Sequence, residues 1–485
     1  MDCRKGAYLC AGFLLTALSI GVLPRCSRAA TMSFGQARAT AMGGAYTAVA
    51  TGVHAPAWNP ANLAFFAAPS TELSLGNLGF FAANDGFSYG DFVGWLDDEV
   101  LTTAEIQSAL GMFPGGAISI RQTMNVGIPF SVRVKQFAVT GEFMEFVSVG
   151  LPRGLFDAIA DDRDATTAYN DARTSGIPYS LSGIVGDVWA VGVTKFSYAR
   201  RVPLRYADAF SVGATLNYYR ASPRVRVVES VGEVLVRPNT WQTDARLVVE
   251  TGGLSVKRTT DAFGDKQTDV EFEAANAWGL GCTLGAAGKL DDKTAISAAL
   301  HNLPLRSIMW NMAERRTYTL DSGSRIINAK SLIDDKPEGV NTLDYLDTLF
   351  AAPGSTVERY ERINSMKANV PAYLRVGMAR SVDLFPAIWT VDFEQGFSRS
   401  ALTSTTPRIA AGIEYLPVGP WIPLRAGMSL GGRSGHFASL GMGFHLRWFH
   451  WDLALANEGA YTPFEVPFSK RARGLGFASE MKLAF

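Results

Sequence analysis

The chain has 485 residues, of which 47% are hydrophobic and 48 are glycine, and its 45 basic and 45 acidic side chains cancel to a formal net charge of zero. This balance argues against a nucleic-acid partner, because such partners select a strongly basic surface. After residue 29 no apolar run approaches the roughly 20 residues of a membrane helix, so a chain that spans a membrane would have to do so as a closed β-barrel.

The N-terminus has the features of an export signal. Arg4 and Lys5 form a basic region, residues 6–23 are apolar, and small side chains favour cleavage after Ala29. We expect residues 1–29 to be a cleavable signal peptide. The alternative is an uncleaved membrane anchor, which the proline and arginines that end the apolar run disfavour.

Residues 30–69 are rich in small side chains and do not alternate as a barrel strand would. Small side chains allow tight packing in a confined space, and Gly43-Gly44 permits a sharp chain reversal. Asn59 precedes Pro60 and is therefore pushed towards an extended or turn conformation. We expect this segment to fill the interior of a barrel as a hatch.

From residue 70 onwards, apolar residues alternate with small or polar ones, which predicts a transmembrane antiparallel β-barrel with its apolar face towards lipid. We expect about fourteen strands, at 71–80, 117–134, 136–147, 185–198, 207–219, 278–288, 294–303, 374–378, 389–394, 409–415, 424–430, 437–447, 451–456 and 474–485. Short turns alternate with long outer loops, which we expect at about 82–115, 149–184, 220–275, 304–371 and 457–473.

The same alternation turns a set of charged side chains into the lumen: Arg375, Asp392, Glu394, Arg408, Glu414, Arg425, Glu480 and Lys482. Two interpretations are open. The favoured one is that these charges pair with one another and with polar groups of the hatch, and so solvate a narrow lumen. The other is that they form a polar passage or a latch for the hatch.

The chain ends in Phe485, with Met481 and Leu483 on the same face of the last strand. This pattern resembles the C-terminal signal that the outer-membrane assembly machinery recognises on barrels. Aromatic rings near other strand ends, such as Trp421 and Trp448, are typical of the membrane–water interface.

No enzyme site emerges from the residues. Gly86-Phe87-Ser88-Tyr89-Gly90 matches a nucleophile pattern, but the preceding strand breaks early and no acid–histidine partners follow, so an outer-loop turn is favoured over a hydrolase. The five histidines lack metal spacing, and Cys282 is the only cysteine after the signal. We expect no enzymatic activity, cofactor or metal. Residues 91–110 suggest an amphipathic helix in the first outer loop.

Two motifs, Met42-Gly43-Gly44-Ala45 and Trp58-Asn59-Pro60-Ala61, resemble the mature N-terminus of the FadL-type outer-membrane proteins, which include a PorV-like branch. Residues 298–303 and 423–427 also resemble this superfamily, so that about half of the chain is covered. The resemblance implies a fourteen-stranded barrel, residues 70–485, whose hatch is shaped by Asn59, Pro60 and Ala61. No outer-loop residues match those that capture substrate.

The resemblance further implies an outer-membrane location and passive transport of hydrophobic or small molecules, which pass the hatch and leave sideways through the wall. A kinked strand within residues 117–147 would fit that route. The alternative is a PorV-like scaffold for protein secretion or surface anchoring, without transport. The implied partners are outer-membrane lipid, the barrel assembly machinery, and either a hydrophobic small molecule or a secreted protein.

Overall fold

The computed structural model describes residues 35–65, 70–84, 86–88, 90–91, 111, 117–154, 177–203, 209–237, 240–260, 266–272, 277–321, 356–398, 403–432, 435–459 and 472–485. The predicted signal peptide and nearly all of the predicted helix at 91–110 lie outside these residues. No helix in the described part of the chain is long and apolar enough to cross a membrane.

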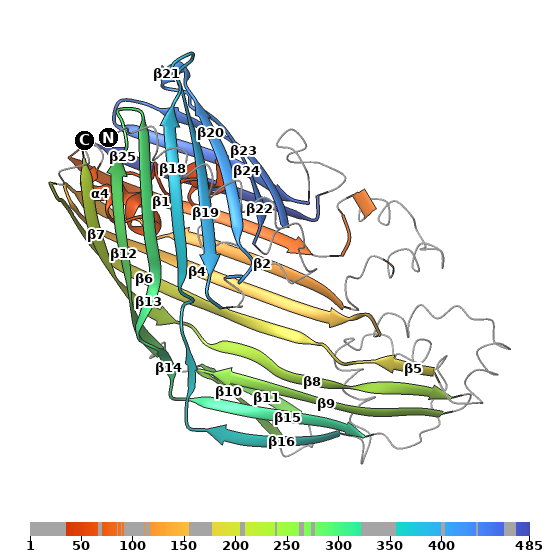
Figure 1. Ribbon diagram of the computed structural model, residues 1–485. Coiled ribbons are helices and arrows are strands. Elements are labelled where there is room, and N and C mark those ends of the chain that lie inside the picture. The colour runs from red at the N-terminus through yellow and green to blue at the C-terminus, as the bar shows by residue number, and fades with distance from the viewer. Residues whose placement is uncertain are drawn as a thin grey trace, which may run out of the picture.

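Fourteen strands form an antiparallel barrel, in which each strand pairs with the next and the last pairs with the first (Figure 1). Closure comes from the first and last strands, where Phe80 lies opposite Phe477. Every predicted strand overlaps one of the fourteen, so the predicted architecture is confirmed. The barrel strands are β1 (Thr71–Asn84), β2 (Ala117–Gly127), β4 (Phe137–Pro152), β6 (Val185–Arg201), β7 (Phe210–Ala221), β12 (Ala277–Lys289), β13 (Thr294–Arg306), β18 (Tyr373–Ser381), β19 (Ala387–Gly396), β20 (Arg408–Tyr415), β22 (Leu424–Gly431), β23 (Gly435–His445), β24 (Phe449–Glu458) and β25 (Gly474–Ala484).

The two faces of the barrel wall differ as the alternation requires. On β25, Phe477 and Met481 are 39% and 42% exposed, whereas Ala478 and Glu480, which point the other way, are 0% and 3% exposed. The outer surface therefore carries an apolar belt, and the fourteen described barrel strands close on themselves without an unpaired edge. These are the two conditions under which a sheet can span a bilayer.

Connections at the two ends of the barrel differ in length. The turns at 290–293, 382–386 and 446–448 lie at the end where β25 terminates, whereas the connections at 222–276 and 307–372 lie at the opposite end. Trp421 and Trp448, at the short-turn end, are each 54% exposed, as expected for rings at a membrane–water interface.

Two of the predicted loops are not loops, and this part of the prediction was wrong. Residues 220–275 and 304–371 contain strands that join the barrel sheet at β6 and extend it as an outer sheet, towards the bottom of Figure 1. The outer sheet consists of β8 (Arg224–Arg237), β9 (Thr240–Gly252), β15 (Ala313–Asp321) and β16 (Thr356–Ile363). Shorter strands flank it: β5 (Ile177–Ser180) pairs with β8, β10 (Leu254–Thr260) with β11 (Lys266–Phe272), and β14 (Ile308–Trp310) with β17 (Met366–Ala368).

Cross-strand ion pairs connect the strands of the outer sheet. Glu250 on β9 accepts from Arg226 on β8 at 2.9 Å and from Arg315 on β15 at 2.6 Å. Burial alone would raise the pKa of Glu250, but hydrogen bonds and charge from these two arginines outweigh it and hold the pKa below its usual value.

The predicted strand 117–134 is also interrupted, and the interruption supplies the kink expected within 117–147. Four residues separate the end of β2 at Gly127 from the start of β3 (Val132–Val134), and among them Phe130 has a φ of 69° and is 75% exposed. Pro129 cannot donate to a ladder, and Ile128 donates its amide to Gly141 instead. We refer to residues 128–131 as the wall bulge.

Replacing Phe485 with alanine is expected to lower the amount of barrel in the outer membrane without weakening the barrel that does form. The Phe485 backbone closes the sheet through Thr71 (N to O, 2.9 Å), but its ring is 61% exposed on the outer surface. The ring is therefore available for recognition by the barrel assembly machinery and contributes little to packing within the barrel. Folded, heat-modifiable protein in membrane fractions measures the effect, with Phe485→Trp as the control. Equal amounts of all three proteins would contradict the assignment.

Candidate functional site

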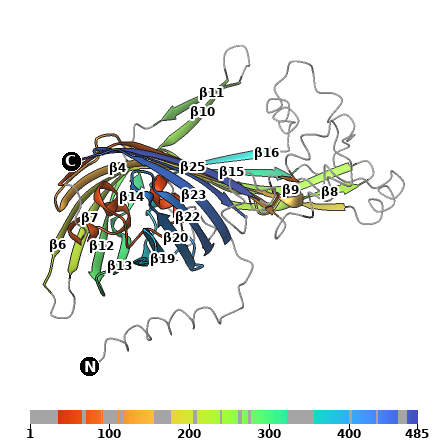
Figure 2. The same cartoon turned by 90° about the horizontal axis from the view of Figure 1, so that it is seen from above.

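The N-terminal segment fills part of the lumen, as predicted for a hatch. It forms α2 (Ala37–Ala41), the 3-10 turn η1 (Gly52–His54), α3 (Ala55–Trp58) and α4 (Asn62–Phe65), and nearly all of residues 35–65 are buried. The barrel strands surround these coils, drawn in red, in two views (Figures 1 and 2). Helix α2 lies against β22 to β25 and α4 against β6, β7 and β12, so the hatch spans the lumen from wall to wall.

Inward-facing glycines let the hatch backbone touch the barrel wall. A Cβ atom on Gly427 would lie 2.0 Å from the carbonyl carbon of Met42, and one on Gly213 would lie 2.5 Å from the backbone of Pro60. Gly412 approaches Met42 in the same way. Any side chain at these wall positions would displace hatch backbone, because no flexible group is present to move aside.

The predicted hatch motif has the local conformation expected of it. Gly43 and Gly44 adopt left-handed φ angles of 66° and 78°, and the Gly43 amide donates to the Ser439 hydroxyl at 3.0 Å. The Asn59 oxygen accepts from the Ala61 amide at 2.9 Å, which closes the local turn before α4. The Asn59 amide also donates to carbonyls of the wall, at Ala286 (2.8 Å) and Ala298 (3.1 Å).

One group of inward charges clamps α2 to the wall. Arg38 of the hatch makes a two-pronged contact with Glu414 at 2.8 and 2.7 Å. Arg425 lies next to it and donates to Glu414 at 2.6 Å and to Asp452 at 2.5 Å. His445 approaches Asp452 at 3.0 Å. Four charged groups, Arg38, Glu414, Arg425 and Asp452, thus alternate in sign from the hatch to the wall.

A second group of inward charges contacts the hatch between residues 46 and 58. The Asp392 carboxylate accepts from the backbone amides of Tyr46 (3.0 Å) and Thr47 (2.8 Å). Arg375 donates to Glu394 at 2.8 Å and lies over the ring of Trp58 at 4.1 Å, a cation–π contact.

The remaining predicted charges also contact the hatch or one another. Glu480 accepts from the Ala37 amide at 2.9 Å and lies 3.2 Å from His54, Arg408 donates to the Gly43 carbonyl, and Lys482 lies 3.3 Å from Glu72. This geometry is that of the favoured interpretation, in which the charges pair with each other and with the hatch. A role as a latch stays a prediction.

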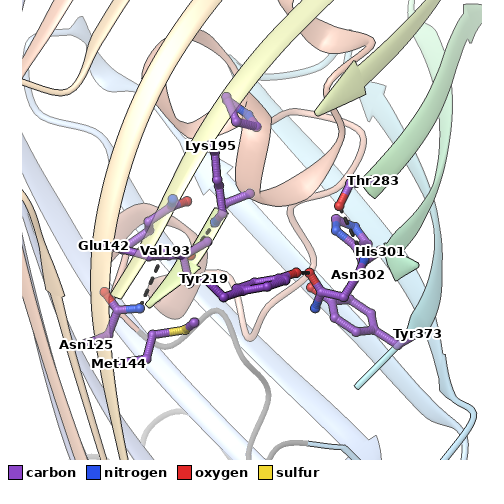
Figure 3. Close-up of a pocket in the computed structure, with 13 residues that line it drawn as sticks. Asn125, Glu142, Met144, Val193, Lys195, Tyr219, Thr283, His301, Asn302 and Tyr373 are labelled. Carbon is purple, nitrogen blue, oxygen red and sulfur yellow. Dashed lines mark hydrogen bonds and ion pairs between the residues drawn. The ribbon is translucent and has the colours of Figure 1, made fainter. Parts of the chain in front are cut away.

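Two cavities lie beside the hatch. The first, about 470 Å³, is lined by Gln36, Pro56, Ala57, Asn125, Glu142, Met144, Val193, Lys195, Tyr219, Thr283, His301, Asn302 and Tyr373 (Figure 3). The second, about 360 Å³, shares Gln36, Ala57, Glu142 and Lys195 with the first. Its other lining residues include Gly127, Ser131 and Gly141, so it reaches the wall bulge.

An apolar cluster adjoins the first cavity. Met144, Val193 and Tyr219 belong to both. The cluster continues through Trp189 and Trp310, whose rings pack edge to face at 6.5 Å. A molecule in the first cavity would thus have polar groups on one side and an apolar wall on the other.

Ser88, the serine of the nucleophile-like pattern, forms hydrogen bonds within a local turn. Its hydroxyl donates to Asp91 at 2.6 Å and its amide donates to the same carboxylate oxygen at 2.7 Å. The histidines contact other groups: His301 stacks on Tyr373 at 4.5 Å, and His445 stacks on His450 at 4.3 Å. In the described ranges, no group of three or more histidine, cysteine or acidic residues is placed to hold a metal ion.

Comparison with known proteins yields one family and several similar folds. The model of a "Family of unknown function (DUF5723)" matches residues 56–454. Among solved structures, the chain is similar to a deletion mutant of the TodX monoaromatic hydrocarbon channel, with 12% identity, 92% of this chain and 96% of that chain covered, and a TM-score of 0.46. It is also similar to a FadL homologue of Pseudomonas aeruginosa, with 12% identity, 95% of this chain and 99% of that chain covered, and a TM-score of 0.44. The CymD monoaromatic hydrocarbon channel is similar as well, with 13% identity, 94% of this chain and 99% of that chain covered, and a TM-score of 0.45. No curated protein matches.

Proposed function

Because the chain belongs to the "Family of unknown function (DUF5723)", whose description names no activity, we propose a function from the barrel interior. The protein is an outer-membrane channel through which small hydrophobic molecules diffuse. It binds and releases them without chemical change, and outer-membrane lipid and the barrel assembly machinery are its obligatory partners.

The observation that carries the proposal is the pair of cavities that leads past the hatch to the wall bulge. They share four lining residues, and together they connect the apolar cluster with residues 128–131. Phe130 and Ile128 of the bulge are exposed on the outer surface of the barrel. The ion pairs around Arg38 and Asp392 fix the hatch across the rest of the lumen. These contacts favour a route that leaves through the barrel wall, rather than one that runs straight through the lumen.

Narrowing the shared part of the two cavities should abolish transport. Ala57 lines both cavities, so Ala57→Phe would place a ring in the junction between them. We expect the uptake of radiolabelled toluene by bacteria that express this variant to fall to the level of bacteria without the barrel. In such cells the lipopolysaccharide layer slows direct diffusion of toluene, so that the channel limits the rate of uptake. Liposomes lack this layer.

Ala411→Phe is the matched control, because Ala411 lies exposed on the outer face of β20. It should transport toluene like the unaltered protein, and both variants should show the heat-modifiable migration of a folded barrel. Toluene uptake that is the same with Ala57→Phe as with the unaltered barrel would refute the cavity route. Uptake that never exceeds that of cells without the barrel would refute the channel.

The PorV-like alternative remains a second candidate because of the outer sheet. Its edge strand β16 presents Arg359, Tyr360 and Glu361 as exposed side chains, a surface on which a secreted protein could dock. A cross-linkable residue at position 359 would trap such a partner in intact cells. Loss of secretion with unchanged toluene uptake, on deletion of β15 and β16, would favour the scaffold.

A further inference from the structure

We propose that the first cavity binds small neutral molecules that carry a hydroxyl or amide N–H group on an apolar body, and that it rejects free carboxylates. This inference rests on the channel function proposed above and specifies its cargo. It depends on three properties of the cavity wall: a cancelled charge, an unpartnered hydrogen-bond acceptor, and an apolar side.

The charge of the cavity is cancelled locally. Lys195 on β6 and Glu142 on β4 form an ion pair, and their side chains are only 11% and 15% exposed. They are the acidic and the basic member of the lining, and both line the second cavity as well. Figure 3 shows the two side chains on neighbouring strands beside the hatch. A carboxylate that approached Lys195 would have to displace Glu142 or lie next to it, and the repulsion is weakly screened in a buried site.

One hydrogen-bond acceptor in the wall has no partner among the described residues. Asn125 on β2 is 3% exposed, and its amide nitrogen lies 3.5 Å from the Glu142 carboxylate. A carboxylate only accepts, so the NH₂ group must face Glu142, and the carbonyl oxygen is the atom that remains. Among the residues that line the first cavity, the Asn125 oxygen is the one buried polar atom without a hydrogen-bond partner in the described residues. A buried acceptor without a hydrogen bond costs folding free energy unless a ligand or a water donates to it.

Several other polar groups of the cavity already have hydrogen-bond partners. The Tyr219 hydroxyl donates to the Asn302 oxygen at 3.0 Å, and the Asn302 amide donates to the Pro371 carbonyl at 3.2 Å. The Thr283 hydroxyl oxygen accepts from Asn217 at 3.1 Å. Asn125 therefore supplies a lining acceptor that no group in the described residues satisfies.

The second cavity repeats this feature. The Asn77 side-chain oxygen is also buried and without a partner in the described part of the chain, and Asn77 lines that cavity. A molecule with one N–H or O–H group would find an acceptor in each cavity on its way to the wall bulge. Its apolar body would lie against Met144, Val193 and the stacked rings of His301 and Tyr373.

Three probes of one size separate the alternatives: benzyl alcohol, toluene and benzoate at pH 7. Binding to the full-length barrel in detergent is measured by calorimetry or ligand-observed NMR. One additional hydrogen bond predicts that benzyl alcohol binds about three- to tenfold tighter than toluene, and benzoate at least about tenfold weaker than benzyl alcohol. Asn125→Leu should remove the advantage of benzyl alcohol and leave toluene unchanged.

Glu142→Gln provides the opposite test, because it leaves the Lys195 charge without its carboxylate. We expect benzoate binding to improve at least about tenfold. Glu145→Gln, on the same strand but on the opposite face, should leave all three affinities as they were. Heat-modifiable migration checks that each variant is folded.

The outcomes are distinguishable from failure of the proposed function. Equal affinities for benzyl alcohol and toluene, or benzoate binding as tight as that of benzyl alcohol, would overturn the selectivity. No binding of any probe to the folded barrel would also overturn it, even if toluene uptake by cells still required the barrel. Binding in the predicted order without uptake would leave the site in place and remove the channel.

Discussion

Gly427→Ala, the addition of one methyl group, is expected to destabilise the barrel by about 3 kcal/mol or more. The new Cβ would lie 2.0 Å from the Met42 carbonyl carbon and 2.1 Å from the Gly43 amide nitrogen. Both atoms are backbone, and the chain is held there by the bond from Gly43 to Ser439. The hatch would have to leave the wall, and its N-terminal residues would become accessible to protease. Urea unfolding in lipid vesicles and limited proteolysis measure the two effects.

Gly192→Ala on β6 is the matched control. A Cβ there would meet only the Arg220 carbonyl oxygen, at 3.6 Å, which is ordinary contact. We expect this variant to unfold and to resist protease like the unaltered protein. If Gly427→Ala were as stable and as protease-resistant as Gly192→Ala, the hatch would not rest on the wall at Gly427.

The barrel itself could be predicted from the sequence because lipid imposes one rule on every strand. Residues such as Phe477 and Met481 must face outwards and Glu480 inwards, and this period of two repeats through all fourteen strands. The outer sheet was not predicted from the sequence. Its strands alternate charged and apolar residues, as in Arg224–Arg237, and their pairing depends on partners such as Glu250 and Arg315 that are 65 residues apart. The alternation of short and long connections made these stretches resemble outer loops.

The candidate site could be predicted only in part, for a similar reason. The inward charges from Arg375 to Lys482 follow from alternation in strands with clear patterns. Lys195 and Glu142 obey the same alternation, since each precedes an exposed phenylalanine, Phe196 or Phe143. That signal could have placed both in the lumen. It could not have shown that they pair, or that Asn125 keeps a free acceptor, because these contacts depend on the register between β2, β4 and β6.

Arg425→Met is expected to destabilise the barrel by about 3–5 kcal/mol, the usual result when one member of a buried ion pair is removed. Arg425 is 4% exposed and lies between Glu414 and Asp452. Methionine would fill the space but leave two buried carboxylates. Among the described residues, Glu414 would keep Arg38 as a partner and Asp452 would keep only His445. The loss of stability should therefore come mainly from the buried Asp452 carboxylate. A second change, Asp452→Asn, should restore part of the stability.

Lys293→Met supplies the control for removing a cation. Lys293 pairs with Asp383 in a turn, with side chains 47% and 73% exposed, and exposed pairs contribute little because water and salt screen them. Urea unfolding of the four proteins in vesicles then separates two explanations. If Arg425→Met is destabilised and Asp452→Asn rescues it, the stability of the hatch junction depends on cancelled charge. If Asp452→Asn brings no rescue, the arginine acts through its shape and hydrogen bonds to Glu414, and the alternating-charge account of the junction is wrong.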